Sequence, residues 1–75
     1  MSKVFDLHKL AEKWPSELVS RSEVARFSGG VLTPKYMANL DSQGDGPERM
    51  RIGRKVCYPV SSLVRWMKSR VSDVG

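Results

Sequence analysis

The sequence of 75 residues has little of the chemistry that small domains commonly use to reinforce a fold. It contains one cysteine, Cys57, and one histidine, His8, so it cannot form an internal disulfide, and these two cannot supply a four-ligand zinc site. A chain of this length forms one domain and buries only about 60% of the surface that its unfolded form exposes. We therefore expect a single small apolar core, with no metal and no other cofactor. The unpaired thiol favours the reducing cytoplasm.

Long apolar runs are also absent. No stretch approaches the ~20 residues of a membrane helix, and residues 1–6 lack the apolar centre of a signal peptide. Catalytic residue types are scarce, because Cys57 has no neighbouring base and no pair of carboxylates is evident. We expect Cys57 to be a packed thiol, His8 to lie on a helix surface, and the protein not to be an enzyme.

Positive charge is in excess and is unevenly distributed along the chain. The net charge is +5, from 13 basic and 8 acidic residues. Residues 1–48 hold 6 basic and 7 acidic side chains, a balance of −1, whereas residues 49–75 hold 7 basic and 1 acidic, a balance of +6. Four of these cations fall within seven residues: Arg49, Arg51, Arg54 and Lys55. Such a cluster attracts polyanions, nucleic acid first, although a solvated, solubilising surface has the same composition.

Residues 1–17 are expected to form an N-terminal extension. Asp6 can cap a short helix over residues 7–13, which Pro15 ends. The apolar residues of this helix fall on one stripe: Leu7, Leu10, Ala11 and Trp14. The alternative is an arm that docks only through Phe5, Leu10 and Trp14.

A second helix is predicted over residues 21–28. Ser20 and Glu23 have the spacing of a capping box, in which the serine hydroxyl accepts from the backbone N–H of Glu23 and the glutamate reaches back. Residues 29–30 are both glycine and stop the helix, because glycine readily adopts the positive φ of a helix C-terminus.

A third helix is predicted from Pro34 to about Gln43. Thr33 caps it, and Pro34 occupies the first position, where a missing N–H costs nothing. The glycines and proline of residues 44–47 end it. Two short helices joined by a tight glycine turn have the layout of a helix-turn-helix.

The third helix has a polar face that suits entry into the major groove of DNA. Lys35, Asn39, Ser42 and Gln43 fall on that face, with the small Ala38 beside it and Tyr36 at the border. Asn39 can pair with adenine, Lys35 can reach a guanine or a phosphate, and Thr33 can bind phosphate with the free N–H groups of the first turn. Asp41 should point away from DNA. The candidate DNA-contacting residues are Thr33, Lys35, Tyr36, Asn39 and Ser42, and the alternative is an ordinary solvated helix face.

A β-hairpin is predicted over residues 50–59, where apolar and basic residues alternate on both sides of Gly53 and Arg54. We expect one face to be apolar, with Met50, Ile52, Val56 and Tyr58. The other face carries Arg51 and Lys55, with Arg54 at the tip. The candidate contacts to phosphate or to a narrow minor groove are Arg49, Arg51, Arg54 and Lys55. The alternative is that these cations protect an edge strand from aggregation.

A last helix is predicted from Ser61 or Ser62 to Val71. One apolar stripe runs along it, with Trp66 at its edge: Val60, Leu63, Val64, Met67 and Val71. The expected fold is mainly α with a small β-hairpin, a winged helix-turn-helix domain over residues 18–71 followed by a tail over residues 72–75.

Several stretches carry a resemblance to a known family: LVSRSEVARF (18–27), LTPKYMANL (32–40), and MRIGRKVCY (50–58) followed by a Leu-x-x-Trp helix. Over residues 18–68 the chain resembles the MerR-like winged-helix excisionases (recombination directionality factors) and the AlpA-type regulators of phages and integrative elements. The resemblance implies that helix 34–43 enters the major groove and that the hairpin is the wing. It also implies cooperative binding to adjacent sites on double-stranded DNA, DNA bending, and assembly with a site-specific integrase, or alternatively regulation at promoters.

Two other classes of function are compatible with a small basic domain: a protein-interaction adaptor and an RNA-binding module. A protein-interaction adaptor without DNA binding would use exposed apolar residues such as Phe5, Trp14 and Trp66. An RNA-binding module is disfavoured, because no run of exposed aromatic residues suggests base stacking.

Overall fold

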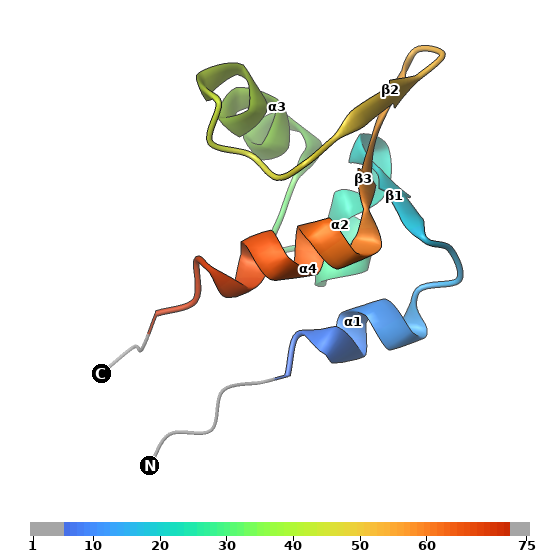
Figure 1. Ribbon diagram of the computed structural model, residues 1–75, viewed down its shortest axis with the longest axis vertical. Helices are drawn as coiled ribbons and strands as arrows, with labels where there is room; N and C mark the ends of the chain where they lie inside the picture. Colours follow the sequence, from blue (N-terminus) through green and yellow to red (C-terminus); the bar gives the residue numbers. More distant parts are fainter. Residues whose placement is uncertain (1–5, 73–75) are drawn as a thin grey trace.

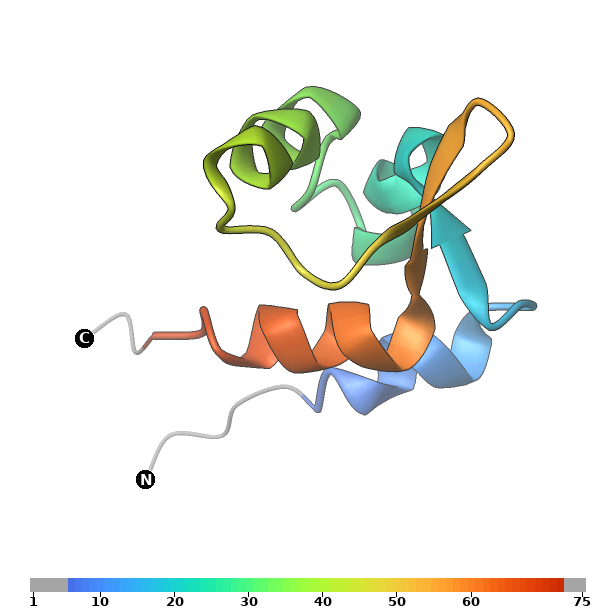
Figure 2. The ribbon, with the colours of Figure 1, turned by 45° about the horizontal axis from the view of Figure 1, so that its top comes forward.

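The computed structural model describes residues 6–72, which form four α-helices and a small antiparallel sheet that lies at one side of the molecule (Figures 1 and 2). In chain order the elements are α1 (His8–Lys13), β1 (Leu18–Ser20), the 3-10 helix η1 (Arg21–Glu23), α2 (Val24–Ser28), α3 (Pro34–Gln43), β2 (Met50–Ile52), β3 (Lys55–Pro59) and α4 (Val60–Lys68). The three strands are ordered β1-β3-β2. The architecture is thus a small fold of helices and one antiparallel sheet.

The core lies where α2, α3 and α4 meet the sheet. Its buried residues come from β1, α2, the segment before α3, α3, β3 and α4: Val19, Val24, Phe27, Leu32, Met37, Tyr58, Val60, Leu63, Val64 and Met67. The stripe of α1 packs against this cluster alongside α4 (Figure 1), and Trp14 meets Phe27 edge to face at 5.4 Å between ring centroids. The predicted N-terminal helix is therefore present and packs on the core. Phe5, the first anchor of the alternative arm, lies outside the described residues.

Strand β1 was missed by the sequence analysis. It is only three residues long, and it pairs antiparallel with β3, Val19 lying opposite Tyr58. A three-residue strand shows no useful periodicity, and its partner is far along the chain. Ser20 therefore has extended geometry as the end of a strand, with φ −72° and ψ 153°.

The predicted capping box at Ser20 is wrong. The chain passes from β1 into η1 and enters α2 only at Val24. No side chain caps either η1 or α2; the Ser20 hydroxyl instead lies 3.4 Å from the Glu23 carboxylate. The end of α2 is as predicted, because Gly29 adopts φ 68°.

Helix α3 matches its prediction from Pro34 to Gln43. The Thr33 hydroxyl accepts from the backbone N–H of Tyr36 at 3.1 Å, and Gly44 ends the helix with φ 79°. Local signals specify this element completely.

The hairpin is present, but the expected division of its faces is wrong. The two-residue turn at Gly53 and Arg54 sets Ile52 opposite Lys55 and Arg51 opposite Val56. Paired residues share a face of the sheet, so Arg51 lies with Val56, while Met50 and Ile52 lie with Lys55 and are exposed. The alternation of apolar and basic residues within each strand does not specify how the two strands pair. The pairing decides which side chains of β2 and β3 share a face of the sheet.

Helix α4 begins earlier and ends earlier than predicted. It starts at Val60, directly after Pro59, and no side chain caps it. Ser62 instead donates to the Glu48 carboxylate at 2.7 Å. The helix ends at Lys68, and Val71 lies beyond it, 46% exposed. Cys57 is a buried free thiol and His8 is exposed on α1, both as expected.

Candidate nucleic-acid interface

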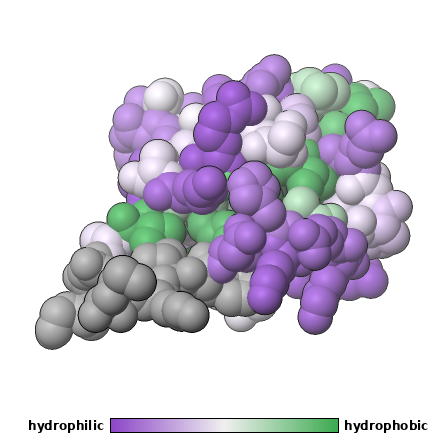
Figure 3. Space-filling model, turned by 60° about the horizontal axis from the view of Figure 1, so that its bottom comes forward, coloured by the Kyte–Doolittle hydropathy of each residue, from purple (hydrophilic) through white to green (hydrophobic). Residues whose placement is uncertain are grey.

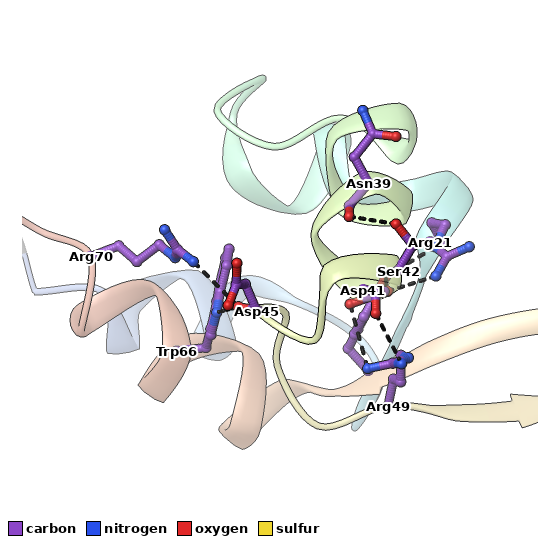
Figure 4. A network of polar contacts seen from close by, with 9 residues as sticks. Arg21, Asn39, Asp41, Ser42, Asp45, Arg49, Trp66 and Arg70 are labelled. Carbon is purple, nitrogen blue, oxygen red and sulfur yellow. Dashed lines mark hydrogen bonds and ion pairs between the residues drawn. The ribbon is translucent and has the colours of Figure 1, made fainter.

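The polar face of α3 is open to solvent. Lys35, Asn39 and Ser42 are all exposed, as is Gln43. Within residues 6–72 the side chains of Lys35 and Asn39 make no hydrogen bond or ion pair, whereas the Ser42 hydroxyl donates to the Asn39 carbonyl at 2.8 Å. The Asn39 amide points away from the rest of the fold (Figure 4). An amide and an ammonium group are therefore free to bind a ligand along this face.

Thr33 and Tyr36 are held differently from the other predicted residues of α3. The Thr33 hydroxyl already accepts the cap hydrogen bond, although it is exposed and can still donate. Tyr36 is 42% exposed and lines an apolar groove with Val31 and Trp66. Tyr36 thus belongs partly to a second surface.

The hairpin presents three cations that lack partners in the described part of the chain. Arg51, Arg54 and Lys55 are exposed, and their side chains form no ion pair or hydrogen bond there. Gly53 adopts φ 62° at the first central position of the turn, where a type II′ turn needs glycine. The tight turn therefore places Arg54 at the tip of the hairpin.

Arg49, the fourth predicted cation, is turned toward α3 and lies before β2. Its Nη2 donates to the backbone carbonyl of Asp41 at 3.3 Å, and its Nη1 lies 3.8 Å from Asp41 Oδ1. Its side chain stays 42% exposed. Of the four cations predicted to contact DNA, three thus lie on the hairpin with side chains that are unpaired among the described residues, and Arg49 contacts Asp41 of α3.

The anchor of this arrangement is Asp41, which the sequence analysis did not recognise. Its side chain is only 4% exposed, and its Oδ2 accepts from Arg21 Nη2 and from the Tyr58 hydroxyl, each at 2.6 Å. Arg21 Nε donates in turn to the Tyr58 hydroxyl at 3.0 Å. A buried carboxylate is costly unless it is paired and hydrogen-bonded, so this network holds α3 against η1 and β3 (Figure 4).

A sequence signal for Asp41 existed. It follows Met37 by four positions, and residues four apart share one helix face. Met37 and Leu40 are both buried, so the same stripe carries Asp41 inward. The Asp41 side chain is buried in an internal ion pair with Arg21 and is not part of the exposed polar face of α3.

The network keeps its own donors protonated. Burial raises the pKa of Tyr58, and the hydrogen bond to Asp41 raises it further, against a smaller lowering by Arg21. The hydrogen bond to Tyr58 is the main reason that the pKa of Arg21 is raised, with a contribution from Asp41 that partly offsets desolvation. Tyr58 and Arg21 therefore remain donors throughout the neutral range.

Gly46 makes room for the carboxylate. A Cβ on Gly46 would collide with Oδ1 of Asp41, although the φ of Gly46 is not in the left-handed region. The following loop is tied to α4, because Trp66 Nε1 donates to the Asp45 carbonyl at 2.9 Å and the Arg70 guanidinium stacks over the Trp66 ring at 4.8 Å (Figure 4). The loop after α3 is thus held against α4 at Asp45.

Helix α3 and the hairpin tip lie at the same side of the molecule, and α1 lies at the opposite side (Figures 1 and 2). A cleft of about 420 Å³ separates α3 from β2. The nine predicted contact residues are all exposed, and most of them belong to these two elements. The fold therefore brings together two groups of side chains that are separated in the sequence.

The described residues also form an apolar groove on another part of the surface. The apolar groove beside Tyr36 has a volume of about 560 Å³, and from below the apolar side chains form small areas interrupted by hydrophilic ones (Figure 3). Among residues 6–72 no group of three or more histidine, cysteine or acidic residues is arranged to hold a metal. No helix in this part of the chain is long and apolar enough to cross a membrane.

Comparison with known proteins finds no matching family model, no matching curated protein and no matching solved structure. The functional interpretation therefore depends on the geometry and charge of the site and on the resemblance of its motifs.

Proposed function

We propose that this chain is a winged helix-turn-helix protein that binds double-stranded DNA. In this proposal α2 and α3 form the helix-turn-helix, α3 is the recognition helix, and β2 and β3 form the wing. The observation that carries the proposal is that α3 and the hairpin lie on the same side of the molecule (Figure 2), and that the polar residues of α3 and the cations of the hairpin are exposed.

The two elements have different tasks in the proposed complex. An exposed asparagine on a helix can form two hydrogen bonds with adenine in the major groove, which is the task assigned to Asn39. Arg51, Arg54 and Lys55 neutralise backbone phosphates, or one of them enters a narrow minor groove. Phosphate contacts set the position of the protein, and base contacts set its sequence preference.

Within this class, we propose an excisionase-like architectural role in the cytoplasm. A single domain of this size buries roughly 600–1,000 Å² on DNA, so its specificity alone is modest. Cooperative binding of further copies and of an integrase on bent DNA, which the resemblance implies, increases that specificity. The same geometry also suits an AlpA- or MerR-like transcriptional regulator, which would bind a promoter.

A non-DNA adaptor is less well supported. Trp14 and Trp66 are only partly exposed, and their ring N–H groups are bound to the carbonyls of Leu18 and Asp45 at 2.9 Å. These aromatic rings therefore offer little free apolar surface.

The test compares the affinity of the wild type and two variants for a panel of duplexes at several salt concentrations. We expect log K to fall with log salt by about 0.9 for each phosphate contacted. Arg54→Glu should weaken binding to all duplexes by similar factors, whereas Asn39→Ala should change the order of preference among them.

Lys68→Glu is the matched control, because Lys68 is exposed on α4 and its side chain forms no hydrogen bond or ion pair with the described residues. It should change affinity less than Arg54→Glu. Absence of binding to every duplex, or binding without salt dependence, contradicts the proposal and favours the adaptor. Footprinting on attachment sites and promoters then separates excision from transcription control.

A further inference from the structure

The cleft between α3 and the hairpin has an unusual lining. Three arginines line it from three parts of the chain: Arg21 from η1, Arg49 from the segment before β2, and Arg51 from β2. The α3 side contributes Ala38, Ser42 and the buried Asp41. Arg21 was not among the residues expected to contact DNA.

The charge of this cleft is positive after its internal ion pairs are counted. Three arginines and one aspartate leave a balance of +2. The Asp41 side chain is 4% exposed, whereas those of Arg21 and Arg49 are 27% and 42% exposed. The negative charge is therefore inside and the positive groups border the opening, which favours an anion in the cleft.

Free donors remain in the cleft. A guanidinium has five N–H groups, and Arg21 uses one at Nε for Tyr58 and one at Nη2 for Asp41. Those two bonds hold its planar group in one orientation, so binding costs little further side-chain entropy. The Arg51 side chain forms no hydrogen bond or ion pair within the described residues and lies on the same face of the hairpin as Val56, which also lines the cleft.

The size and position of the cleft indicate what it binds. A guanidinium matches two oxygens of a phosphate group, and the small Ala38 leaves room on the helix side. In the proposed complex, a DNA strand that runs from the recognition helix to the wing would pass over this opening.

We propose that the cleft binds one backbone phosphate of the duplex, with Arg21 and Arg51 as donors and Asp41 as the positioning residue that orients Arg21. The inference deepens the proposed function and rests on it.

The experiment first selects a duplex from a random-sequence pool with the full-length wild type. Each phosphate of that duplex is then replaced, one at a time, by an uncharged methylphosphonate. We expect one or two adjacent positions to lower the affinity of the wild type about tenfold, as expected for loss of hydrogen bonds to a charged group. In Arg51→Gln, which removes no internal contact, the same replacement should cost clearly less.

Arg21→Lys provides the second variant, because it keeps the charge and removes the planar fork. In this variant too, the methylphosphonate replacement at that phosphate should lower the affinity less than it does in the wild type. Circular dichroism should show that the fold is retained. Lys68→Gln removes one positive charge at a site outside the cleft. In this variant the methylphosphonate replacement should lower the affinity as much as it does in the wild type.

The outcomes are separable. If the pool yields no duplex, the proposed function fails and this inference fails with it. If a duplex binds but Arg51→Gln keeps the full wild-type effect at every phosphate, the cleft site alone is overturned.

Discussion

Helices α3 and α4 are attached to the protein by different forces. Four apolar residues of α4 are buried, among them Leu63 at 0% and Val64 at 1% exposure. Helix α3 buries two apolar residues, Met37 and Leu40, and adds the charged Asp41 to the same face. Apolar burial is non-directional, whereas a paired carboxylate with two short hydrogen bonds sets an orientation.

This difference corresponds to the tasks proposed for the two helices. A helix that completes a core needs only close packing, and α4 supplies that. A recognition helix needs a defined angle to the wing and a solvent-exposed face. The Asp41 network supplies the first without covering the second, because it lies below α3 and beside the hairpin (Figure 4).

The largest expected loss of stability comes from removing apolar packing between α4 and the core. Leu63→Ala removes a fully buried side chain and should lower the free energy of unfolding by about 2–5 kcal/mol, from lost burial and the cavity left behind. Urea denaturation measures it. Val31→Ala is the control, because Val31 is 72% exposed, and should change stability by less than about 0.5 kcal/mol. Equal losses would mean that α4 does not form the core.

Asp41→Asn tests the charged attachment. The amide keeps the shape but loses the charge, so the bonds from Arg21 and Tyr58 weaken, and we expect a loss of about 2 kcal/mol. Asp45→Asn removes the same charge two residues beyond α3, where the side chain is exposed, and should be nearly neutral. A similar result for both variants would show that net charge, and not the network, governs stability.

Alkaline pH tests the same network through Tyr58. Its pKa is raised in the folded state, mainly by burial and then by the hydrogen bond to Asp41, so its contribution is complete below about pH 10. That stability is lost as the pH rises through the folded-state pKa. Tyr58→Phe should cost about 1.5 kcal/mol at pH 7, and its stability should fall less than that of the wild type above pH ~10. Tyr36→Phe is the control substitution, because Tyr36 is exposed and lies outside this network.

The smallest expected loss of stability comes from substitutions at the first residues of α3 and α4. Thr33→Ala removes the cap hydrogen bond to Tyr36 and should cost about 1 kcal/mol. Ser61→Ala, in the first turn of α4, should cost less than about 0.5 kcal/mol, because no side chain caps that helix. Thermal unfolding of both variants measures the contrast, and a reversed order would refute the capping assignment.

Elements with strong local signals were predicted well. Thr33, Pro34 and Gly44 specify the start and end of α3 with interactions inside a few residues. The two-residue turn at Gly53 and Arg54 likewise specifies the hairpin. The nine candidate contact residues are exposed as expected, and their role in binding remains a proposal.

Features that depend on distant partners were missed or assigned wrongly. Strand β1 exists because β3 pairs with it, and the faces of the hairpin follow from strand register. Ser20 resembled a helix cap but ends a strand, and Ser62 bonds to Glu48 instead of capping α4. Ser62 bonds to a residue fourteen positions away, and Ser20 lies in a strand opposite Cys57 of β3, so distant contacts decide the structure at both serines.

The sequence by itself determined the helix starts and stops that glycine, proline and threonine control, the turn of the hairpin, and the concentration of positive charge after residue 48. These properties depend on backbone preferences and charges of neighbouring residues. Only the tertiary structure decided that Arg21, Asp41, Arg49 and Tyr58 meet, and that Arg51 faces a cleft with them. A buried ion pair requires desolvation and close geometry from several elements at once, and no local pattern encodes that combination.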